Sequence, residues 1–445
     1  MVEFFKLEIP DCSKVDTKKI ILKIVFEKNI IDPLIQQTSQ PYYIYWDKFK
    51  YKKNITKEYT HEELWAAIKW ARKMQSKKSV IKNEKGNFFV RFNLSTLDEF
   101  FHEIDLNAGG SLFAPVKDID EKNKFKFISR GVVEEAIASS QLEGANTTRQ
   151  LAKQFLREGR KPRIEAEHMI LNNYNAMVAI EQEYKKRELD RNMLFDLHSM
   201  IVKNTAPKEE QGIFRIDKDD IVVSDEKFVY HIPPKIAFVE NEINRLIEFA
   251  NDKMEVGDFV HPVLKAIKIH FWIGYLHPFT NGNGRLARLL FYWYLLRKGY
   301  WAFAYLPIST IIKRSPSQYK KAYIYSEQDE LDLTYFIDYH IRKIKLAIKD
   351  FQLYLKKKAI ENKRMNSLAK KTYHLNDRQI QLLQYYYKNK EEYTNPKMHI
   401  RIYQISKKTA INDLKGLKHL GFVSSQKVGR NIHYYATDKV EELFI

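Results

Sequence analysis

Residues His277–Arg288 read HPFTNGNGRLAR and carry the strongest local signal in the sequence. An apolar segment with helical periodicity precedes it at 261–276 and is expected to deliver the histidine to a tight loop. Glycines on both sides of Asn283 allow positive φ angles and close approach of the backbone to a ligand. A second helix is expected directly afterwards, so its first free N–H groups point into the loop and favour an anion. Arg285 and Arg288 lie on one face of that helix. The stretch therefore predicts a phosphate cradle with a base beside it.

Each of these features alone has an ordinary structural explanation. A lone histidine is usually structural, a Gly-Asn-Gly segment is usually a turn, and two arginines on a helix usually form a solvated face. Their occurrence within one short stretch favours a functional loop. Three other nucleotide sites are excluded, because the chain has no Walker-type Gly-Lys-Ser/Thr, no kinase signature set and no dinucleotide fingerprint after a strand.

The surrounding sequence predicts a mainly α-helical fold. Helices are expected at 130–143, 147–158, 163–185, 190–204, 236–254, 261–276, 283–298, 316–328 and 332–360. The segment 221–232 interrupts this pattern and reads as a strand, a polar turn and a second strand. A lone hairpin in a helical domain is either a surface decoration or a flap over a site. Earlier in the chain the signal is weaker, with short β-rich runs at 20–26 and 42–45.

The residues of His277–Arg288 resemble the signature of the Fic family (Fic/DOC), His-x-Phe-x-Asp/Glu-Gly-Asn-Gly-Arg-x-x-Arg. The resemblance implies a Fic-type helical bundle, which agrees with the helical periodicity. It also implies an enzyme that transfers AMP from ATP to a hydroxyl side chain of a target protein. It assigns 130–341 to the catalytic domain, and 1–129 resembles the N-terminal extension of bacterial members.

Site roles follow from the resemblance by position. His277 would be the general base that takes the proton of the target hydroxyl, and its pKa suits that role at neutral pH. Arg285 would bind phosphate oxygens and stabilise developing charge, and Arg288 would hold the γ-phosphate. The nucleotide-binding residues would be Asn281, Gly282, Asn283, Gly284, Arg285 and Arg288. The hairpin 221–232 would be a flap that pairs with an extended target segment. Its target-binding residues would be Ile221, Val222 and Val223.

One position departs from the resembled signature. Asn281 stands where Asp or Glu is usual, and that carboxylate normally helps to hold Mg²⁺. Mg²⁺ is thus expected with ATP, but Asn281 would be a weaker metal ligand. Gly284 is retained where related phosphotransferase toxins have lysine, which favours AMP transfer.

A second motif lies upstream, where Ser139–Gly144 reads SSQLEG. Alone, a glutamate at a helix end before glycine is unremarkable. Beside the central loop it resembles the inhibitory helix of many Fic proteins, Ser/Thr-x-x-x-Glu-Gly/Asn, expected here at 130–144. Ser139 and Glu143 would be its functional residues. Glu143 would pair with Arg288 and occupy the charge meant for the γ-phosphate. In some relatives the same glutamate supports removal of AMP, so both directions stay open.

The C-terminal part predicts a separate α+β unit. A Lys-rich helix and linker are expected at 342–371, with the linker at 362–367. The segment 372–445 resembles a winged helix-turn-helix. Its expected elements are helices 377–388 and 407–420 and strands 398–402, 422–426 and 431–436. Its candidate DNA-binding residues are Lys407, Lys408, Lys415, Lys418 and Arg430.

The charge is unevenly distributed along the chain. The formal net charge is +19 over 445 residues, and 342–445 holds 23 Lys and Arg against 9 Asp and Glu. Any polyanion partner is therefore expected at the C-terminal part. The single cysteine, Cys12, excludes an internal disulfide framework and a Cys-rich zinc module, so a reducing cytoplasmic setting is expected. The apolar run Leu289–Leu296 is too short to span a membrane, and no membrane partner is expected.

The sequence thus predicts an autoinhibited protein adenylyltransferase that uses ATP and modifies a target protein or itself. Two alternatives remain open at this stage. The chain could be a DNA-binding regulator with a weak or degenerate Fic domain, or a Fic enzyme that removes AMP or transfers another phosphate group. Dimerisation is common in the resembled family, so a homodimer is a further expectation.

Overall fold

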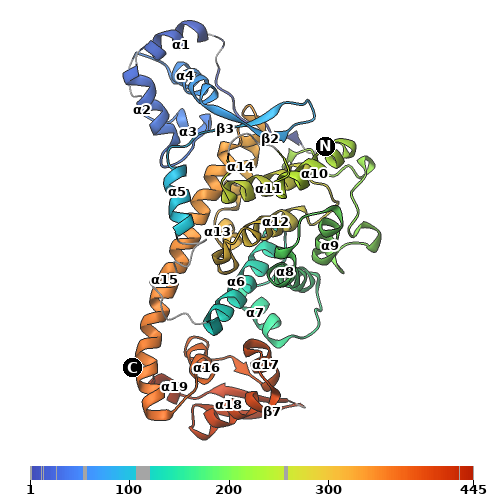
Figure 1. The fold of residues 1–445 in the computed structure, drawn as a ribbon, viewed down its shortest axis with the longest axis vertical. Helices are drawn as coiled ribbons and strands as arrows, with labels where there is room; N and C mark the ends of the chain where they lie inside the picture. Colours follow the sequence, from blue (N-terminus) through green and yellow to red (C-terminus); the bar gives the residue numbers. More distant parts are fainter. Residues whose placement is uncertain are drawn as a thin grey trace.

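Two buried helices, α11 (Pro262–Leu276) and α12 (Asn283–Arg297), form the centre of the fold (Figure 1). The structure is a computed structural model. It describes residues 3–11, 13, 15–26, 28–53, 58–106, 121–254, 259–429 and 431–443. Both central helices are apolar around most of their circumference, as expected for helices enclosed by others. Trp272 and Trp293 are fully buried on them.

The central helices are enclosed by a layer of further helices, which confirms the prediction of a mainly α fold. These are α6 (Glu121–Leu142), α7 (Arg149–Glu158), α8 (Glu165–Gln182), α9 (Arg191–Val202), α10 (Ile236–Ala250), α13 (Ile308–Ile312) and α14 (Pro316–Gln328). Short 3₁₀ turns join them at Tyr184–Lys186, Lys208–Glu210, Asp217–Asp219 and Trp301–Tyr305. Most ends of the predicted helices in this region lie within a few residues of the observed ones. The helix expected at 130–143 is an exception, because α6 already begins at Glu121.

The predicted hairpin is present as part of a small three-stranded sheet. Strands β4 (Val223–Ser224) and β5 (Phe228–His231) pair antiparallel. The N-terminal strand β1 (Glu3–Phe4) adds to the other side of β5 in parallel, so the strand order is β1-β5-β4. The sequence predicts that the first strand starts at Ile221, but it starts at Val223. Asp220 lies in the left-handed region with φ of 46°, and extended structure begins only after it.

The N-terminal part packs against the same core, at the end of the molecule opposite the C-terminal elements (Figure 1). Its elements are α1 (Thr17–Phe26), α2 (Lys28–Ser39), α3 (Trp46–Phe49), α4 (His61–Met74), β2 (Ser76–Lys82), β3 (Phe88–Phe92) and α5 (Leu97–Ile104). The strand expected at 20–26 is wrong, because this segment belongs to α1. A carboxylate oxygen of Asp16 accepts a hydrogen bond from the N–H of Lys19 and caps the helix. The run 42–45 forms no strand either, and Ile44 donates its N–H to the carbonyl of Thr38.

The long helix α15 (Thr334–Tyr373) runs from the N-terminal part to the C-terminal elements (Figure 1). Residues 362–367, expected to be a linker, lie inside this helix. The expected break is therefore wrong.

The C-terminal elements form their own small core and sheet. They are α16 (Asp377–Lys388), β6 (Tyr393–Thr394), α17 (Pro396–Tyr403), α18 (Lys407–His419), β7 (Val423–Val428), β8 (Asn431–Ala436) and α19 (Lys439–Glu442). The sheet order is β6-β8-β7. The strand expected at 398–402 is wrong, because Asn395 caps a helix there and Pro396 occupies its first turn. The identification of this unit as a winged helix stays a prediction.

Membrane spans were searched for in the described part of the chain. No helix there combines the length and the apolar character that crossing a membrane requires.

Candidate active site

The loop between α11 and α12 is clamped from both sides. Phe279 is fully buried, and its ring stacks on that of His198 with centroids 3.7 Å apart. The Asn283 side chain accepts a hydrogen bond from the N–H of Phe279 at 3.0 Å and donates one to its carbonyl at 2.7 Å. The Asn283 amide is therefore committed to bracing the loop, which leaves only its backbone N–H at the helix start for a ligand.

His277 ends α11 in the left-handed conformation, with φ of 46°. Its Nδ1 lies 3.3 Å from the carbonyl oxygen of Gly274. A carbonyl only accepts, so Nδ1 carries the proton and Nε2 keeps a free electron pair. Burial lowers the pKa of His277 to about 4, and repulsion from His231 adds to the effect. His277 is therefore neutral at neutral pH and can accept a proton.

The glycines of the loop lie close to neighbouring side chains, and Gly282 also adopts a positive φ. A Cβ on Gly282 would lie 2.8 Å from Cγ1 of Val202, and its φ of 80° is strained for other residues. A Cβ on Gly284 would lie 2.3 Å from Oε1 of Glu143. The Glu143 carboxylate thus lies directly against the start of α12, where the free N–H groups and the helix dipole favour an anion.

Arg285 is buried beside the loop. Its Nη1 donates to the carbonyl of Ile201 at 2.6 Å, and its Nη2 donates to Oδ1 of Asn281 at 3.3 Å. Its Nε is buried and has no hydrogen-bond partner among the described residues. Burial lowers the pKa of Arg285, opposed by attraction from Glu143. A buried guanidinium with an unused donor can bind an anion.

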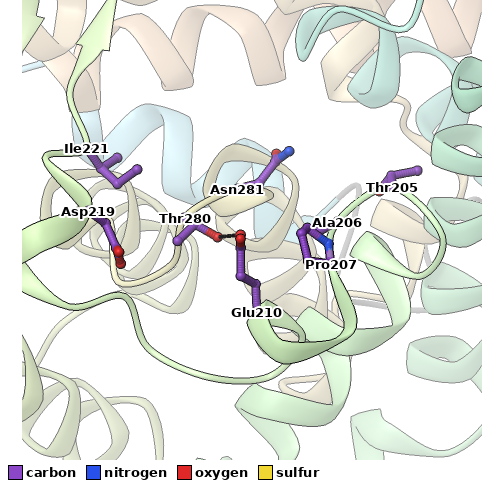
Figure 2. A pocket seen from close by; sticks show the side chains of 8 residues that line it. All are labelled: Thr205, Ala206, Pro207, Glu210, Asp219, Ile221, Thr280 and Asn281. Atoms are coloured by element: carbon purple, nitrogen blue, oxygen red, sulfur yellow. Dashed lines mark hydrogen bonds between the residues drawn. The ribbon is translucent and has the colours of Figure 1, made fainter.

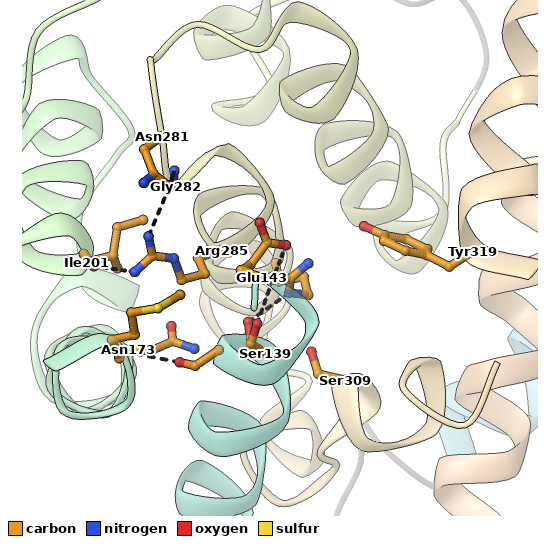
Figure 3. Close-up of polar contacts among 12 residues, drawn as sticks. Ser139, Glu143, Asn173, Ile201, Asn281, Gly282, Arg285, Ser309 and Tyr319 are labelled. Carbon is orange, nitrogen blue, oxygen red and sulfur yellow. Dashed lines mark hydrogen bonds and ion pairs between the residues drawn. The ribbon is translucent and has the colours of Figure 1, made fainter. Parts of the chain in front are cut away.

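Arg288 is held by the residues predicted to be inhibitory, Ser139 and Glu143; Figure 3 labels both of these residues beside Arg285. Its Nε donates to Oγ of Ser139 at 2.7 Å, and its Nη2 lies 2.9 Å from Oε1 of Glu143. Burial opposes ionisation of Glu143, but attraction and hydrogen bonding from Arg288 outweigh it and lower the pKa of that carboxyl. The Arg288 side chain is buried, whereas that of Glu143 is 29% exposed. The structure thus brings Ser139 and Glu143, near the end of α6, into contact with Arg288, which lies far from them in the sequence.

Asn281 offers a poor site for Mg²⁺. Its Oδ1 already accepts from the N–H of Gly282 at 2.6 Å and from Arg285 at 3.3 Å. A guanidinium beside that oxygen repels a cation. No group of three His, Cys, Asp or Glu side chains in the described ranges is placed to hold a metal. The residues present therefore do not fit a metal ion held by the protein.

A cavity of about 380 Å³ lies beside the loop (Figure 2). Thr280 and Asn281 line it from the loop, and Ile221 lines it from the segment before β4. Oγ of Thr280 donates to Oε2 of Glu210 at 2.5 Å on its wall. Of the predicted flap residues, Ile221 thus reaches the site, whereas Val222 is exposed and Val223 lies in the edge strand β4.

Two supporting residues were missed from the sequence. His198 accepts from the N–H of Gly212 through Nδ1 at 3.0 Å, and its Nε2 donates to the carbonyl of Asn281 at 2.9 Å. Arg215 donates from Nε to the carbonyl of His277 at 2.8 Å. An isolated histidine and an isolated arginine form no sequence pattern from which these contacts could be predicted.

The candidate DNA-binding residues lie apart from this site. Lys407, Lys408, Lys415 and Lys418 are exposed on α18. Arg430 lies outside the described residues. The acidic residue of this helix, Asp413, is buried and paired with Arg378. The outward face of α18 is therefore basic.

Comparisons with known proteins point to one family. Residues 188–295 match the sequence model of the Fic/DOC family. The chain is 32% identical over 107 residues to a protein adenylyltransferase Fic from Nematostella vectensis, covering 24% of this chain and 23% of the relative. It is 36% identical over 107 residues to a protein adenylyltransferase Fic from Aedes aegypti, covering 24% of this chain and 19% of the relative.

These matches span about a quarter of the length of the curated relatives, or less. Among solved structures, a Fic family protein from Desulfovibrio desulfuricans G20 superposes with a TM-score of 0.47 and 16% identity, covering 77% of this chain and 95% of that chain. The family match contains the loop and the hairpin, and it ends before the C-terminal elements.

Proposed function

We propose, from the Fic/DOC domain at residues 188–295 and the geometry of its loop, that this chain is a protein adenylyltransferase. It would transfer AMP from ATP to a hydroxyl side chain of a target protein or of itself. The observation that carries the proposal is a neutral His277 with a free Nε2 at the loop that leads to the start of α12. Two buried arginines, Arg285 and Arg288, lie on that helix.

The proposed chemistry needs a base and an anion cradle. Nε2 of His277 takes the proton of the target hydroxyl as its oxygen attacks the α-phosphorus of ATP. The bond from the α-phosphorus to the bridging oxygen breaks, and pyrophosphate leaves with the electron pair. The N–H groups at the start of α12 and the Arg285 guanidinium would stabilise the negative charge on the phosphates. Because Asn281 does not fit a protein-held ion, Mg²⁺ would enter with ATP, and no step is assigned to it.

We further propose that Glu143 inhibits this activity within the same chain. Its carboxylate lies against Gly284 and pairs with Arg288. A triphosphate would need that position and that arginine for its γ-phosphate. Loss of Glu143 would vacate that position and remove the anionic partner of Arg288, which keeps its hydrogen bonds to Ser139. The same carboxylate could instead position a water that removes AMP, and this direction is an outcome of the test below.

The chemistry is tested by isotope position. The Glu143→Gly variant is incubated with ATP labelled at the α- or the γ-phosphate, with Glu143→Gly/His277→Ala as the blank. We expect α-label and no γ-label on protein, and none in the blank. A γ-label would show phosphate transfer and contradict the proposal. Loss of AMP from a premodified protein, faster in the wild type, would show that removal is the main direction.

We propose that the hairpin receives the target through the outer edge of β4. Strand β5 is paired on both sides, with β4 and with β1, so β4 and β1 form the two edges of this sheet. Ile221, just before β4, reaches the cavity beside the loop. An extended segment added to β4 would therefore pass close to the loop. A proline at Val223 should block this pairing and reduce modification of a target more than binding of ATP.

A second candidate function is binding of duplex DNA by α18. The observation that favours it is the outward face of this helix, with Lys407, Lys408, Lys415 and Lys418 exposed and Asp413 buried. Lysines on such a face neutralise phosphates and release counterions. The test is anisotropy of a labelled duplex with the full chain at several salt concentrations. A variant with all four lysines changed to Gln should lower the salt slope by about three to four. An unchanged slope would contradict this function.

A further inference from the structure

A second histidine lies beside the proposed base. His231 is the last residue of β5, and its ring centroid is 6.5 Å from that of His277. Its Nδ1 lies 2.6 Å from Oε2 of Glu327 on α14, and its Nε2 lies 2.7 Å from the carbonyl oxygen of Tyr275 on α11. The side chain is buried. His231 therefore joins the hairpin, α14 and the helix that carries His277.

Both ring nitrogens of His231 face acceptors. A carbonyl oxygen only accepts, so Nε2 must carry a proton. An ionised carboxylate also only accepts, so Nδ1 must carry one as well. This geometry describes an imidazolium paired with Glu327. Burial opposes the charge, but attraction and hydrogen bonding from Glu327 outweigh it and raise the pKa of His231.

Three charged side chains among the described residues act on the protonation of His277. His231 lies on the hairpin side, and Arg215 binds the carbonyl of His277 at 2.8 Å. Glu143 faces it from the end of α6 and is the acidic group of this set. The two cations favour the neutral form of His277, and the carboxylate opposes them. His231 ranks directly after burial among the causes that lower the pKa of His277.

We propose that His231 is a positioning residue for His277: an imidazolium, held by Glu327, that ties the hairpin to α11 and keeps the proposed base unprotonated. This inference rests on the role proposed for His277. Val223 of β4 pairs with His231 across the hairpin. The strand proposed to receive the target is therefore joined, through one residue, to the helix that ends at the base.

Two variants separate the charge of His231 from its hydrogen bonds. In Glu327→Gln, His231 can keep its bond to the Tyr275 carbonyl and accept a bond from the new amide, so the shape is kept and the charge is lost. In His231→Gln, the amide can still donate to Tyr275, but the carboxyl of Glu327 loses its imidazolium partner. The repulsion from His231 is lost in both variants. Glu327→Gln also removes the opposite charge of Glu327, whereas His231→Gln keeps it, so the effect on His277 should be larger in His231→Gln. Glu330→Gln serves as control, since that carboxylate has a 62% exposed side chain.

The measurement is the titration of His277 followed by nuclear magnetic resonance of ring-labelled histidine, assigned with His277→Ala. At a separation of 6.5 Å, losing one charge should raise the titration midpoint by on the order of one pH unit. We expect the midpoint to rise from the wild type to Glu327→Gln and further to His231→Gln, with Glu330→Gln unchanged. The pH below which the AMP transfer rate falls should rise in the same order of variants.

Equal midpoints in all variants would overturn the inference, even if AMP transfer were intact. Absence of transfer in every variant would instead contradict the proposed function and leave the titration interpretable. If His231→Gln does not fold, Glu327→Gln decides alone, because it preserves the shape of the site.

Discussion

Two of the arginine–carboxylate pairs among the described residues, Glu143–Arg288 and Asp413–Arg378, are built differently. Glu143 meets Arg288 through one contact at 2.9 Å, and its side chain is 29% exposed. Asp413 meets Arg378 through two contacts at 2.6 and 3.1 Å, and its side chain is 5% exposed. Asn376 adds a further hydrogen bond to Asp413 at 2.7 Å. We expect that another anion can displace the first carboxylate and that the second is fixed. The number of donors and the exposure of the carboxylate, more than the presence of a pair, distinguish a switch from a structural contact.

The largest expected effect is on stability, when the fixed pair Asp413–Arg378 is broken. Asp413→Ala removes the acceptor of Arg378 and of the buried His399 and leaves their donors unpaired. Breaking a buried pair in this way costs about 3–5 kcal/mol. The measurement is hydrogen exchange of α16 and α18 by mass spectrometry. Asp438→Ala, at an exposed position, is the matched control. Equal protection in the two variants would show that the fixed pair is dispensable.

The Glu143–Arg288 pair should control the affinity for ATP. A charged hydrogen bond contributes about 1.5–3 kcal/mol. Releasing Arg288 by Glu143→Gly should therefore tighten ATP binding by roughly tenfold or more. Glu143→Gln, which keeps the shape and removes the charge, should give most of this gain. Calorimetric titration measures both, with the exposed Glu183→Gln as control. Equal affinities for the wild type and Glu143→Gly would remove the basis of the switch.

The fixed pair should also give the C-terminal elements a pH dependence. Burial opposes ionisation of Asp413, but Arg378, Asn376 and His399 outweigh it and lower its pKa. A carboxyl with a lowered pKa stabilises the folded state above its unfolded pKa, about 3.9 for aspartate, and the contribution is lost as the pH falls through the lowered value. Protection of α16 should thus be constant from pH 8 to about 4 and fall below that. A decline between pH 8 and 6 would point to another group.

The smallest effect is expected for the pH dependence of inhibition. The pKa of Glu143 is lowered, because Arg288 outweighs the effect of burial. Glu143 therefore stays ionised, and the clamp on Arg288 persists, throughout the neutral range. The ratio of the AMP transfer rates of Glu143→Gly and the wild type should be the same at pH 6 and pH 8. A ratio that shrinks toward pH 6 would mean that Glu143 protonates there.

The central helices and the loop could be predicted because their signals are local. The apolar runs, the glycines and the histidine lie next to one another in the sequence, and helix ends followed from them. The errors were also local. The β-branched residues at 20–26 predicted a strand, although Asp16 caps a helix there. A strand was likewise predicted at 398–402, although Asn395 and Pro396 are typical of the start of a helix. The helix continuing through 362–367 carries polar residues that composition alone assigns to a linker.

The contacts that complete the site could not be predicted. Arg215 binds a backbone carbonyl of His277, and His231 pairs with Glu327 across 96 residues. Such contacts depend on the arrangement of several elements, and no spacing in the sequence encodes them. The pairing of Glu143 with Arg288 was expected only because the motif resembled an inhibitory helix. The structure supplies the contact itself and its position against Gly284.

The most direct test of the central claim is the rate of AMP incorporation from α-labelled ATP, measured side by side for the wild type, Glu143→Gly and Glu143→Gly/His277→Ala. The account predicts weak incorporation by the wild type, strong incorporation by Glu143→Gly, and a loss of about 10²–10⁴-fold when His277 is also replaced. Equal rates for the wild type and Glu143→Gly, with ATP bound to both, would contradict it.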